Sequence, residues 1–409
     1  MEKRIRTLKS FEGVTLRMVT GYTEDSEYLV STLVPRLEAE TGIRLEVDQV
    51  NHEVLFEKQI KDVTGDQIYD IVNPCTEWVR QYSIFTVPLS PYFGRDGYPD
   101  SEIDDIIPGV WNSWNPTKDY FWLPYQPDSR VFYYRTDLLQ EAGMTPPKNW
   151  DELKIAVSKL YKKGERYGFG FPGKKSDFMN LAWIPILFSA GGDIFDHDLK
   201  PTLNHQPGVD SLEFLLELLK YGPEDITRFG KLDHYQAAKA GRIAFGIEAS
   251  GITQALEAHD SVVKGKIGTD VFPIRSRNTH RPFTAIMGGW ALGVAKYSKK
   301  INAAAWVVLW LTSKNVVTDW QIHGRAHAAR ISMVKNSKLL EVNPHLPTII
   351  RNFAQTKLFF DGPEGNKLEQ ALMDSLSRAI SGEIGAKEAL DGAAMKFDRI
   401  LEREDRRSR

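Results

Sequence analysis

The sequence predicts an α/β protein built from two lobes. At 409 residues, the chain is longer than a domain that usually forms around one hydrophobic core. Strand-like and helix-like periodicities alternate from residue 14 to 72 and again from 121 to 247, and sheets wound with helices produce this alternation. No tandem repeat or long linker separates the two runs. We therefore expect closely joined lobes, with a chain that crosses between them more than once.

The first lobe begins with a strand predicted at 14–19, where apolar and polar residues alternate. A helix follows at 28–41, with Leu29, Leu33 and Leu37 at helical spacing, and Gly42 ends it. The remaining elements predicted for this lobe are a strand at 43–50, a helix at 53–64 and a strand at 68–72.

The second lobe follows an extended segment at 121–135. Its predicted elements are helices at 150–162, 178–189, 209–220 and 233–241 and a strand at 243–247. The glycine-rich run 168–173 lacks a strand-to-helix phosphate fingerprint, so we predict a turn there. After it come strands on either side of Gly288-Gly289-Trp290, within 284–296, and helices at 301–312, 316–322, 366–381 and 385–402.

The composition excludes several classes of function. The 52 basic residues nearly cancel the 54 acidic ones, so net charge favours neither nucleic acid nor an anionic membrane as a partner. No stretch approaches the roughly 20 apolar residues of a membrane span. The single cysteine, Cys75, excludes an intrachain disulfide and a thiolate metal cluster, and a buried apolar role is expected for it rather than catalysis. No phosphate loop or serine-nucleophile elbow occurs, and we expect no cofactor.

Several segments, in order, resemble the sugar-binding class of extracellular solute-binding proteins of ABC transporters, the class that includes maltose-binding protein. They are RLEAETGIRLEV, WLPYQPDSRVFYYRTDLLQEAGMTPPKNWDELKIAVSKL, AGGDIFDHDLKPTLNHQPGVDSLEFLLELL, GRIAFGIEASG, GGWALGVAKYSKKINAAAWVVLWLTS and ALMDSLSRAISGEIGAKEALDGAAMKFDRIL. Each segment is moderately specific, but their common order and spacing over residues 14–401 is highly specific.

The resemblance implies a periplasmic-binding-protein-like fold, with a hinge and a ligand cleft between the lobes. The N-terminal lobe would comprise 13–124 and 283–327, and the C-terminal lobe 128–280 and 332–402, with crossings near 125–130, 280–284 and 326–332. The protein would be a monomer that delivers a mono- to trisaccharide, or a sugar derivative, to a membrane permease.

The resemblance also implies a periplasmic protein, or a lipid-anchored extracellular one. The first ten residues are basic but lack an apolar run of signal-peptide length, and we interpret the sequence as a form without its leader.

A sugar site needs flat aromatic faces and hydrogen-bonding side chains. In the family the Gly288-Gly289-Trp290 motif lies at the cleft, where glycines allow close backbone approach and Trp290 offers a stacking face; the alternative is a bulged strand with a core tryptophan. Asn73, Glu77 and Trp78 follow a buried strand, where α/β sheets bind ligands. The alternative interpretation of these three residues is that they form the capped start of a helix.

Other candidates lie on the crossings and in the second lobe. Tyr125 and Asp128 occupy the first crossing, together with Gln126 and Arg130, and Arg130 has the alternative of pairing with Asp128. Asn180, Glu248 and Ser250 are candidates from the second lobe, whereas Trp183 has the alternative of a core position. Arg325, with His327 and Arg330 nearby, suggests an acidic group on the sugar, and a solvated hinge loop is the alternative.

Two other functions compete with transport. A sensing partner of a membrane receptor would use the same closure around a carbohydrate. A glycosidase would need paired carboxylates such as Glu77 and Asp128, but we favour a protein without enzymatic activity. The i, i+4 pair His323 and His327 has the spacing of zinc ligands but lacks the rest of the motif, so no metal is expected.

Overall fold

A computed structural model describes residues 7–22, 24–115, 119–281, 283–324, 329–359 and 364–407. The side chains at 24, 25, 52, 53, 77, 80 and 403–407 are outside this description. The described residues divide into two compact units. Unit 1 contains those within 7–128 and 287–346, and unit 2 contains those within 129–286, 347–359 and 364–407.

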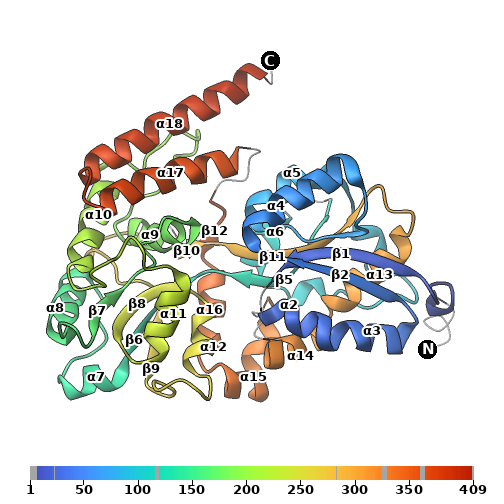
Figure 1. Ribbon diagram of the computed structural model, residues 1–409, viewed down its shortest axis with the longest axis horizontal. Coiled ribbons are helices and arrows are strands. Elements are labelled where there is room, and N and C mark those ends of the chain that lie inside the picture. The colour runs from blue at the N-terminus through green and yellow to red at the C-terminus, as the bar shows by residue number, and fades with distance from the viewer. Residues whose placement is uncertain are drawn as a thin grey trace. The chain divides into compact units, whose positions relative to one another are not determined.

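Unit 1 is organised around a six-stranded sheet in the order β2-β1-β3-β11-β4, with β5 also paired to β11. The parallel strands are β1 (Thr15–Gly21), β2 (Arg44–Val50) and β3 (Ile71–Val72). Strand β11 (Gly288–Ala295) runs antiparallel to β3, β4 (Thr86–Val87) and β5 (Leu123–Asp128). Figure 1 shows the late strand β11, in orange, beside the early strand β5, in cyan. A late strand therefore pairs with three early ones, β3, β4 and β5.

The helices of unit 1 include one with buried residues around its whole circumference, α13 (Ile301–Leu311), in which Ala303 to Leu311 are all buried. The other helices are α2 (Glu24–Tyr28), α3 (Val34–Thr41), α4 (His52–Lys61), α5 (Val79–Ser83), α6 (Pro108–Trp114), α14 (Lys314–Gly324) and α15 (Ser337–Val342). Short π-helical turns lie at Leu29–Leu33 and Asp62–Asp66, and 3₁₀ turns lie at Thr76–Trp78, Ser90–Tyr92, Ile103–Asp105 and Ile331–Lys335.

Unit 2 has a four-stranded sheet in the order β7-β8-β6-β9. Strands β7 (Tyr167–Gly170) and β8 (Ile243–Ala249) are parallel, whereas β6 (Arg130–Arg135) runs antiparallel to β8 and to β9 (Ile267–Asp270). A small parallel pair, β10 (Ala285–Ile286) and β12 (Thr356–Lys357), lies outside this sheet.

Most of the helices of unit 2 contribute to one large hydrophobic core. They are α7 (Thr136–Glu141), α8 (Trp150–Leu160), α9 (Asp177–Ser189), α10 (Gln206–Leu219), α11 (Lys231–Lys239), α12 (Ile252–Leu256), α16 (Leu346–Phe353), α17 (Gly365–Ile380) and α18 (Ala386–Arg407). Helix α9 is buried at every position from Met179 to Ser189. In Figure 1, α17 and α18, in red, lie side by side as the closing pair of this unit.

The prediction of a turn at 168–173 is wrong for its first half, because Gly168 to Gly170 lie within β7. A Cβ on Gly168 would lie 2.4 Å from the carbonyl oxygen of Val157 in α8. A Cβ on Gly170 would lie 2.7 Å from the Ile243 side chain in β8. These glycines therefore permit close packing of a strand, where the sequence suggested a turn.

Candidate ligand-binding site

In unit 1, polar and aromatic side chains gather at the carboxyl edge of the sheet, where β1 and β3 end. Asn73 directly follows β3 and is completely buried. Its amide nitrogen donates to the Thr20 hydroxyl over 2.8 Å and to the Tyr125 hydroxyl over 3.3 Å. Its Oδ1 atom has no hydrogen-bond partner within the described residues. The ring of Tyr125 stacks on Trp320, with centroids 4.8 Å apart.

Beside Asn73 lies an aromatic group that we call the Trp290 cluster, formed by Phe56, Trp78, Tyr82 and Trp290. Trp290 and Trp78 meet edge to face with centroids 5.7 Å apart, and Phe56 lies 5.0 Å from Trp78. Trp290 is the one residue of β11 that is not buried. Cys75 pairs with Trp290 through an isolated β-bridge. The local fold therefore holds the half-buried Trp290 ring against a buried aromatic support.

The two glycines before Trp290 differ in how much space surrounds them. Gly289 has φ +107°, and a Cβ there would lie 2.1 Å from the carbonyl oxygen of Gln126 in β5. A Cβ on Gly288 would meet nothing closer than 3.7 Å, at the Asp128 carbonyl oxygen. Gly289 is thus required by the close approach of β5, which carries the predicted residues Tyr125 and Asp128.

Unit 2 has a corresponding edge, where β7 and β8 end and β6 begins. We call the group there the Arg130 cluster: Arg130, Phe178, Lys231, His234 and Glu248. The Arg130 guanidinium is buried and its carbon lies 5.7 Å from the Phe178 ring centre. The Lys231 ammonium lies 4.4 Å from the same ring centre. Two cations from different elements therefore flank one aromatic side chain.

Glu248 is the carboxylate of this cluster and is completely buried. One oxygen accepts the Ala249 backbone N–H at 2.8 Å, and the other lies 3.4 Å from His234 Nδ1. The second ring nitrogen of His234 lies 2.7 Å from the Tyr133 hydroxyl. Burial raises the pKa of Tyr133 well above its usual range, and the nearby Glu248 carboxylate adds to that increase. These contacts fix the direction in which Glu248 and His234 point.

Acidification is expected to remove the stabilisation that Glu248 contributes. Burial alone raises the pKa of this carboxyl, but His234, Arg130 and Lys231 outweigh burial, and the net pKa is below the ordinary value of 4.5. A carboxylate with a lowered pKa in the fold stabilises it above the unfolded-state pKa and loses that contribution as the pH falls. The Tm difference between the native protein and Glu248→Gln should therefore be largest at neutral pH and shrink below pH about 4.5. A difference that stays constant down to pH about 3 would contradict this role.

The other two candidates of unit 2 are also buried. The Asn180 amide nitrogen donates to the Glu369 carbonyl oxygen at 2.9 Å and so connects α9 to α17, while its Oδ1 has no hydrogen-bond partner within the described residues. Ser250 follows β8, and its backbone N–H donates to the Ser129 carbonyl oxygen at 2.8 Å. Trp183 is a core residue, as its alternative interpretation stated.

The remaining predicted residues cannot be placed in either cluster. Arg325 and His327 lie outside the described residues, and so does the side chain of Glu77. Arg330 is buried and donates to three backbone carbonyls, at Glu102 (2.8 Å), Ser101 (3.1 Å) and Thr312 (2.7 Å). This guanidinium therefore holds loops of unit 1 together, and the idea that Arg330 signals an acidic ligand is not supported by its contacts.

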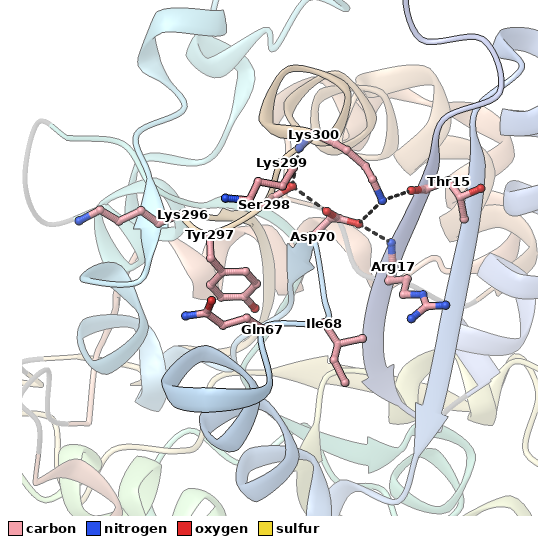
Figure 2. Close-up of a pocket in the computed structure, with 10 residues that line it drawn as sticks. All are labelled: Thr15, Arg17, Gln67, Ile68, Asp70, Lys296, Tyr297, Ser298, Lys299 and Lys300. Carbon is pink, nitrogen blue, oxygen red and sulfur yellow. Dashed lines mark hydrogen bonds and ion pairs between the residues drawn. The ribbon is translucent and has the colours of Figure 1, made fainter.

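A separate pocket of about 520 Å³ lies at the opposite, amino edge of the unit 1 sheet. Asp70 accepts the Arg17 backbone N–H at 3.0 Å and the Ser298 hydroxyl at 2.6 Å, while Lys300 donates to the Thr15 carbonyl oxygen at 2.6 Å. Figure 2 shows Lys300 reaching toward Asp70, whereas Lys296 extends away from it. These polar groups join the starts of β1 and β3 to the end of β11. The pocket therefore lies at the other end of the strands from Asn73 and Trp290.

Within the described ranges, no group of three or more His, Cys, Asp or Glu side chains is arranged to hold a metal ion. In the same part of the chain, no helix combines the length and apolar character needed to cross a bilayer. His323 contacts Asp319 at 3.3 Å and stacks on Tyr28, and its predicted partner His327 is outside the description.

Fold and site together define a class of protein: two α/β units, each with buried polar and aromatic side chains at the edge where its parallel strands end. The family model for bacterial extracellular solute-binding proteins matches residues 21–317. The chain belongs to this family, and the predicted periplasmic-binding-protein-like fold class is confirmed.

Individual relatives are distant. The chain is 26% identical over 350 residues to a probable amino-acid ABC transporter periplasmic-binding protein of Sinorhizobium fredii, an alignment covering 84% of this chain and 78% of the relative. It is 24% identical to the mannitol-binding protein of Pseudomonas aeruginosa, with 74% of each chain covered. A ribitol complex of an Agrobacterium radiobacter solute-binding protein has a TM-score of 0.83 at 24% identity, covering 95% of this chain and 99% of that one. Maltose-bound MalE3 of T. maritima has a TM-score of 0.84 at 20% identity, with 95% and 100% covered.

Proposed function

We propose that this protein binds a carbohydrate, either a polyol or a mono- to trisaccharide, and delivers it to the membrane permease of an ABC importer. The Trp290 cluster carries the proposal, because its half-buried tryptophan ring lies on a buried aromatic support beside the buried amide of Asn73. An aromatic face suits the C–H side of a sugar, and an amide oxygen accepts a hydrogen bond from a sugar hydroxyl. Relatives whose names mention mannitol, ribitol and maltose agree with this ligand class.

The candidate contacts in unit 1 are Gly288, Gly289, Asn73, Glu77, Trp78, Tyr125, Asp128 and Trp290, and those in unit 2 are Asn180, Glu248 and Ser250. Arg325 completes the predicted set. We propose a monomer that acts outside the cytoplasmic membrane, periplasmic or lipid-anchored, and that releases its ligand chemically unchanged. That one ligand touches both units stays a prediction.

An amino acid is the second candidate ligand, because the S. fredii relative is named for amino-acid transport. Its carboxylate and ammonium groups would require charged partners, which occur in the Arg130 cluster, whereas the Trp290 cluster that carries the proposal offers uncharged aromatic faces. This difference favours a carbohydrate for this chain.

Thermal unfolding in the presence of ligands tests whether the protein binds a carbohydrate or an amino acid. A ligand that binds only the folded protein, at a hundred times its Kd, stabilises the fold by about 2.7 kcal/mol, which raises Tm by several degrees. We expect such a shift with a sugar, polyol or sugar acid, and recovery of the compound unchanged by chromatography. A shift with amino acids alone would contradict the carbohydrate proposal, and consumption of the sugar would contradict a purely binding role.

A further inference from the structure

We infer that Gln59 and Thr20 are positioning residues of the ligand site in unit 1 and that both act through Asn73. Gln59 holds the backbone of Asn73, and Thr20 holds its side-chain amide. This inference rests on the proposed function, in which Asn73 is a candidate contact of the carbohydrate. It assigns a role in binding to helix α4, which carries Gln59, and to the end of β1, which carries Thr20.

The side chain of Gln59 forms two hydrogen bonds with the backbone of Asn73. Its Nε2 donates to the Asn73 carbonyl oxygen at 2.9 Å, and its Oε1 accepts the Asn73 backbone N–H at 3.3 Å. Both residues are buried. In a longer strand these two backbone groups would pair with a neighbouring strand, so Gln59 takes the place of a strand partner. Strand β3 accordingly ends at Val72, and Asn73 is held where the chain leaves the sheet.

Gln59 occupies a position in α4 where packing alone favours an apolar residue. Leu55 and Gln59 are four residues apart on one face of the helix, and both are buried. Burying a glutamine costs free energy unless its amide is hydrogen-bonded, and the two bonds to Asn73 offset that cost. A methionine would fill the same space without holding Asn73. The choice of a polar residue therefore points to a requirement at Asn73.

The side chain of Asn73 is held separately from its backbone. Its Nδ2 donates to the hydroxyl groups of Thr20, at 2.8 Å, and Tyr125, at 3.3 Å. Thr20 lies in β1 and is buried. With both amide hydrogens used in this way, the remaining polar atom is Oδ1, which has no hydrogen-bond partner within the described residues. The amide is therefore fixed with an acceptor left for a ligand hydroxyl.

Helix α4 connects this polar part of the site with its aromatic part. Phe56 lies three residues before Gln59, so the two side chains leave the helix on the same side. The Phe56 ring lies 5.0 Å from that of Trp78 in the Trp290 cluster. One helix therefore supports both Asn73 and Trp78, and a change at Gln59 is expected to displace Asn73 while every aromatic ring of the cluster is kept.

Gln59→Met and Asn115→Leu form a matched pair of variants. Asn115 is also buried in unit 1, and its amide donates to the Trp122 carbonyl oxygen at 2.9 Å and accepts the Trp122 N–H at 3.2 Å. Trp122 precedes β5, at the opposite edge of the sheet from Asn73. Each variant roughly keeps the size of the side chain and removes two hydrogen bonds to one backbone residue. We therefore expect both variants to lower the Tm by several degrees.

The two variants should differ in ligand binding, measured by isothermal titration calorimetry. The probes are D-mannitol, ribitol, maltose and any other sugar, polyol or sugar acid that raises the Tm of the native protein. We expect Gln59→Met to lower the affinity about tenfold and Asn115→Leu to change it less than about twofold. Asn73→Ala should weaken binding at least as much as Gln59→Met. Because Gln59 acts through Asn73, adding Gln59→Met to Asn73→Ala should lower the affinity less than about twofold further.

Thr20→Val is a second variant, which keeps the inference testable if Gln59→Met does not fold. Valine has nearly the shape of threonine, so the variant removes the acceptor of the Asn73 amide and leaves the bonds from Gln59 in place. It should weaken binding about threefold or more, again without a further effect in Asn73→Ala. Amide hydrogen exchange adds a readout without ligand. The Asn73 N–H should exchange at least about tenfold faster in Gln59→Met, while the amides of the β1–β2 ladder keep the native rate.

The outcomes separate the two proposals. Native affinity in either folded variant, an equal loss of affinity in Asn115→Leu, or native exchange of the Asn73 N–H in Gln59→Met would overturn the positioning inference while the carbohydrate function stands. Effects of Gln59→Met and Asn73→Ala that multiply would overturn it as well, because the two residues would then act independently. Failure of every carbohydrate to bind the native protein, together with binding of an amino acid, would overturn the proposed function itself.

Discussion

Trp290→Ala is expected to weaken carbohydrate binding by about 10- to 100-fold while the protein remains folded. Covering an aromatic face with a ligand removes apolar surface from water and contributes about 1.5–3 kcal/mol, and each 1.4 kcal/mol is a tenfold change in Kd. The Trp290 side chain is half-buried and touches Trp78 through an edge-to-face contact, so part of its surface is open to a ligand. Calorimetry with the ligand found by thermal shift measures the effect.

Trp111→Ala is the matched control for this variant. Trp111 is also a partly exposed tryptophan of unit 1, but it contacts Tyr120, just before β5 begins at the opposite edge of the sheet. Trp290→Phe keeps a flat apolar face and should retain most of the affinity. If Trp290→Ala binds as tightly as the native protein, the Trp290 cluster is not the ligand site.

Much of the fold could be predicted because its elements have strong periodicity. The strand predicted at 14–19 corresponds to β1, where Leu16 and Met18 are completely buried and Arg17 between them is exposed. The helix predicted at 150–162 corresponds to α8, which Asn149 caps by accepting the Glu152 backbone N–H. In both cases local pattern and tertiary burial favour the same structure.

The single helix predicted at 28–41 is divided in the structure. Helix α2 ends at Tyr28, a π-helical turn occupies Leu29–Leu33, and α3 begins at Val34. Pro35 lies in the first turn of α3 and has no N–H to donate, so the regular helical ladder is interrupted there. The leucine spacing predicted the apolar face correctly but could not show this change in winding.

The strand predicted at 68–72 is reduced to Ile71–Val72 for a different reason. The Asp62 carboxylate accepts the backbone N–H groups of Ile68 and Tyr69, at 2.6 and 3.4 Å. These donors are therefore not available to a neighbouring strand. A contact between residues six or seven apart through a side chain leaves no periodic signal in the sequence.

Candidate site residues that follow strands were accessible to sequence reasoning, since the ends of parallel strands meet at one edge. Asn73 and Trp78 were selected on that basis, and the structure places them beside Trp290. Lys231 was missed because its contact with Phe178 joins residues 53 positions apart on two helices. Its one local signal was a lysine at the start of a short helix, where an acidic residue is the more usual choice.

Gly289→Ala is expected to destabilise unit 1 by about 2–5 kcal/mol, because it combines backbone strain with overpacking. The residue has φ +107°, a conformation that side chains disfavour, and the new methyl group would lie 2.1 Å from a backbone oxygen of β5. No rotation of a side chain relieves a clash with backbone, so β5 and β11 must separate. Thermal and chemical unfolding, followed by circular dichroism, measure the loss, and a Tm within a degree of the native value would contradict the geometry.

Gly288→Ala is the neighbouring control and also tests the site. Its φ is not in the left-handed region, and its methyl group would meet only ordinary contacts at 3.7 Å or more, so we expect a change in stability of less than about 0.5 kcal/mol. If a ligand approaches the backbone beside Trp290, the added methyl group must occupy part of that space and raise Kd. Stability kept with affinity lost would separate a glycine needed for ligand approach from one needed for strand packing. Stability and affinity both kept would remove Gly288 from the site.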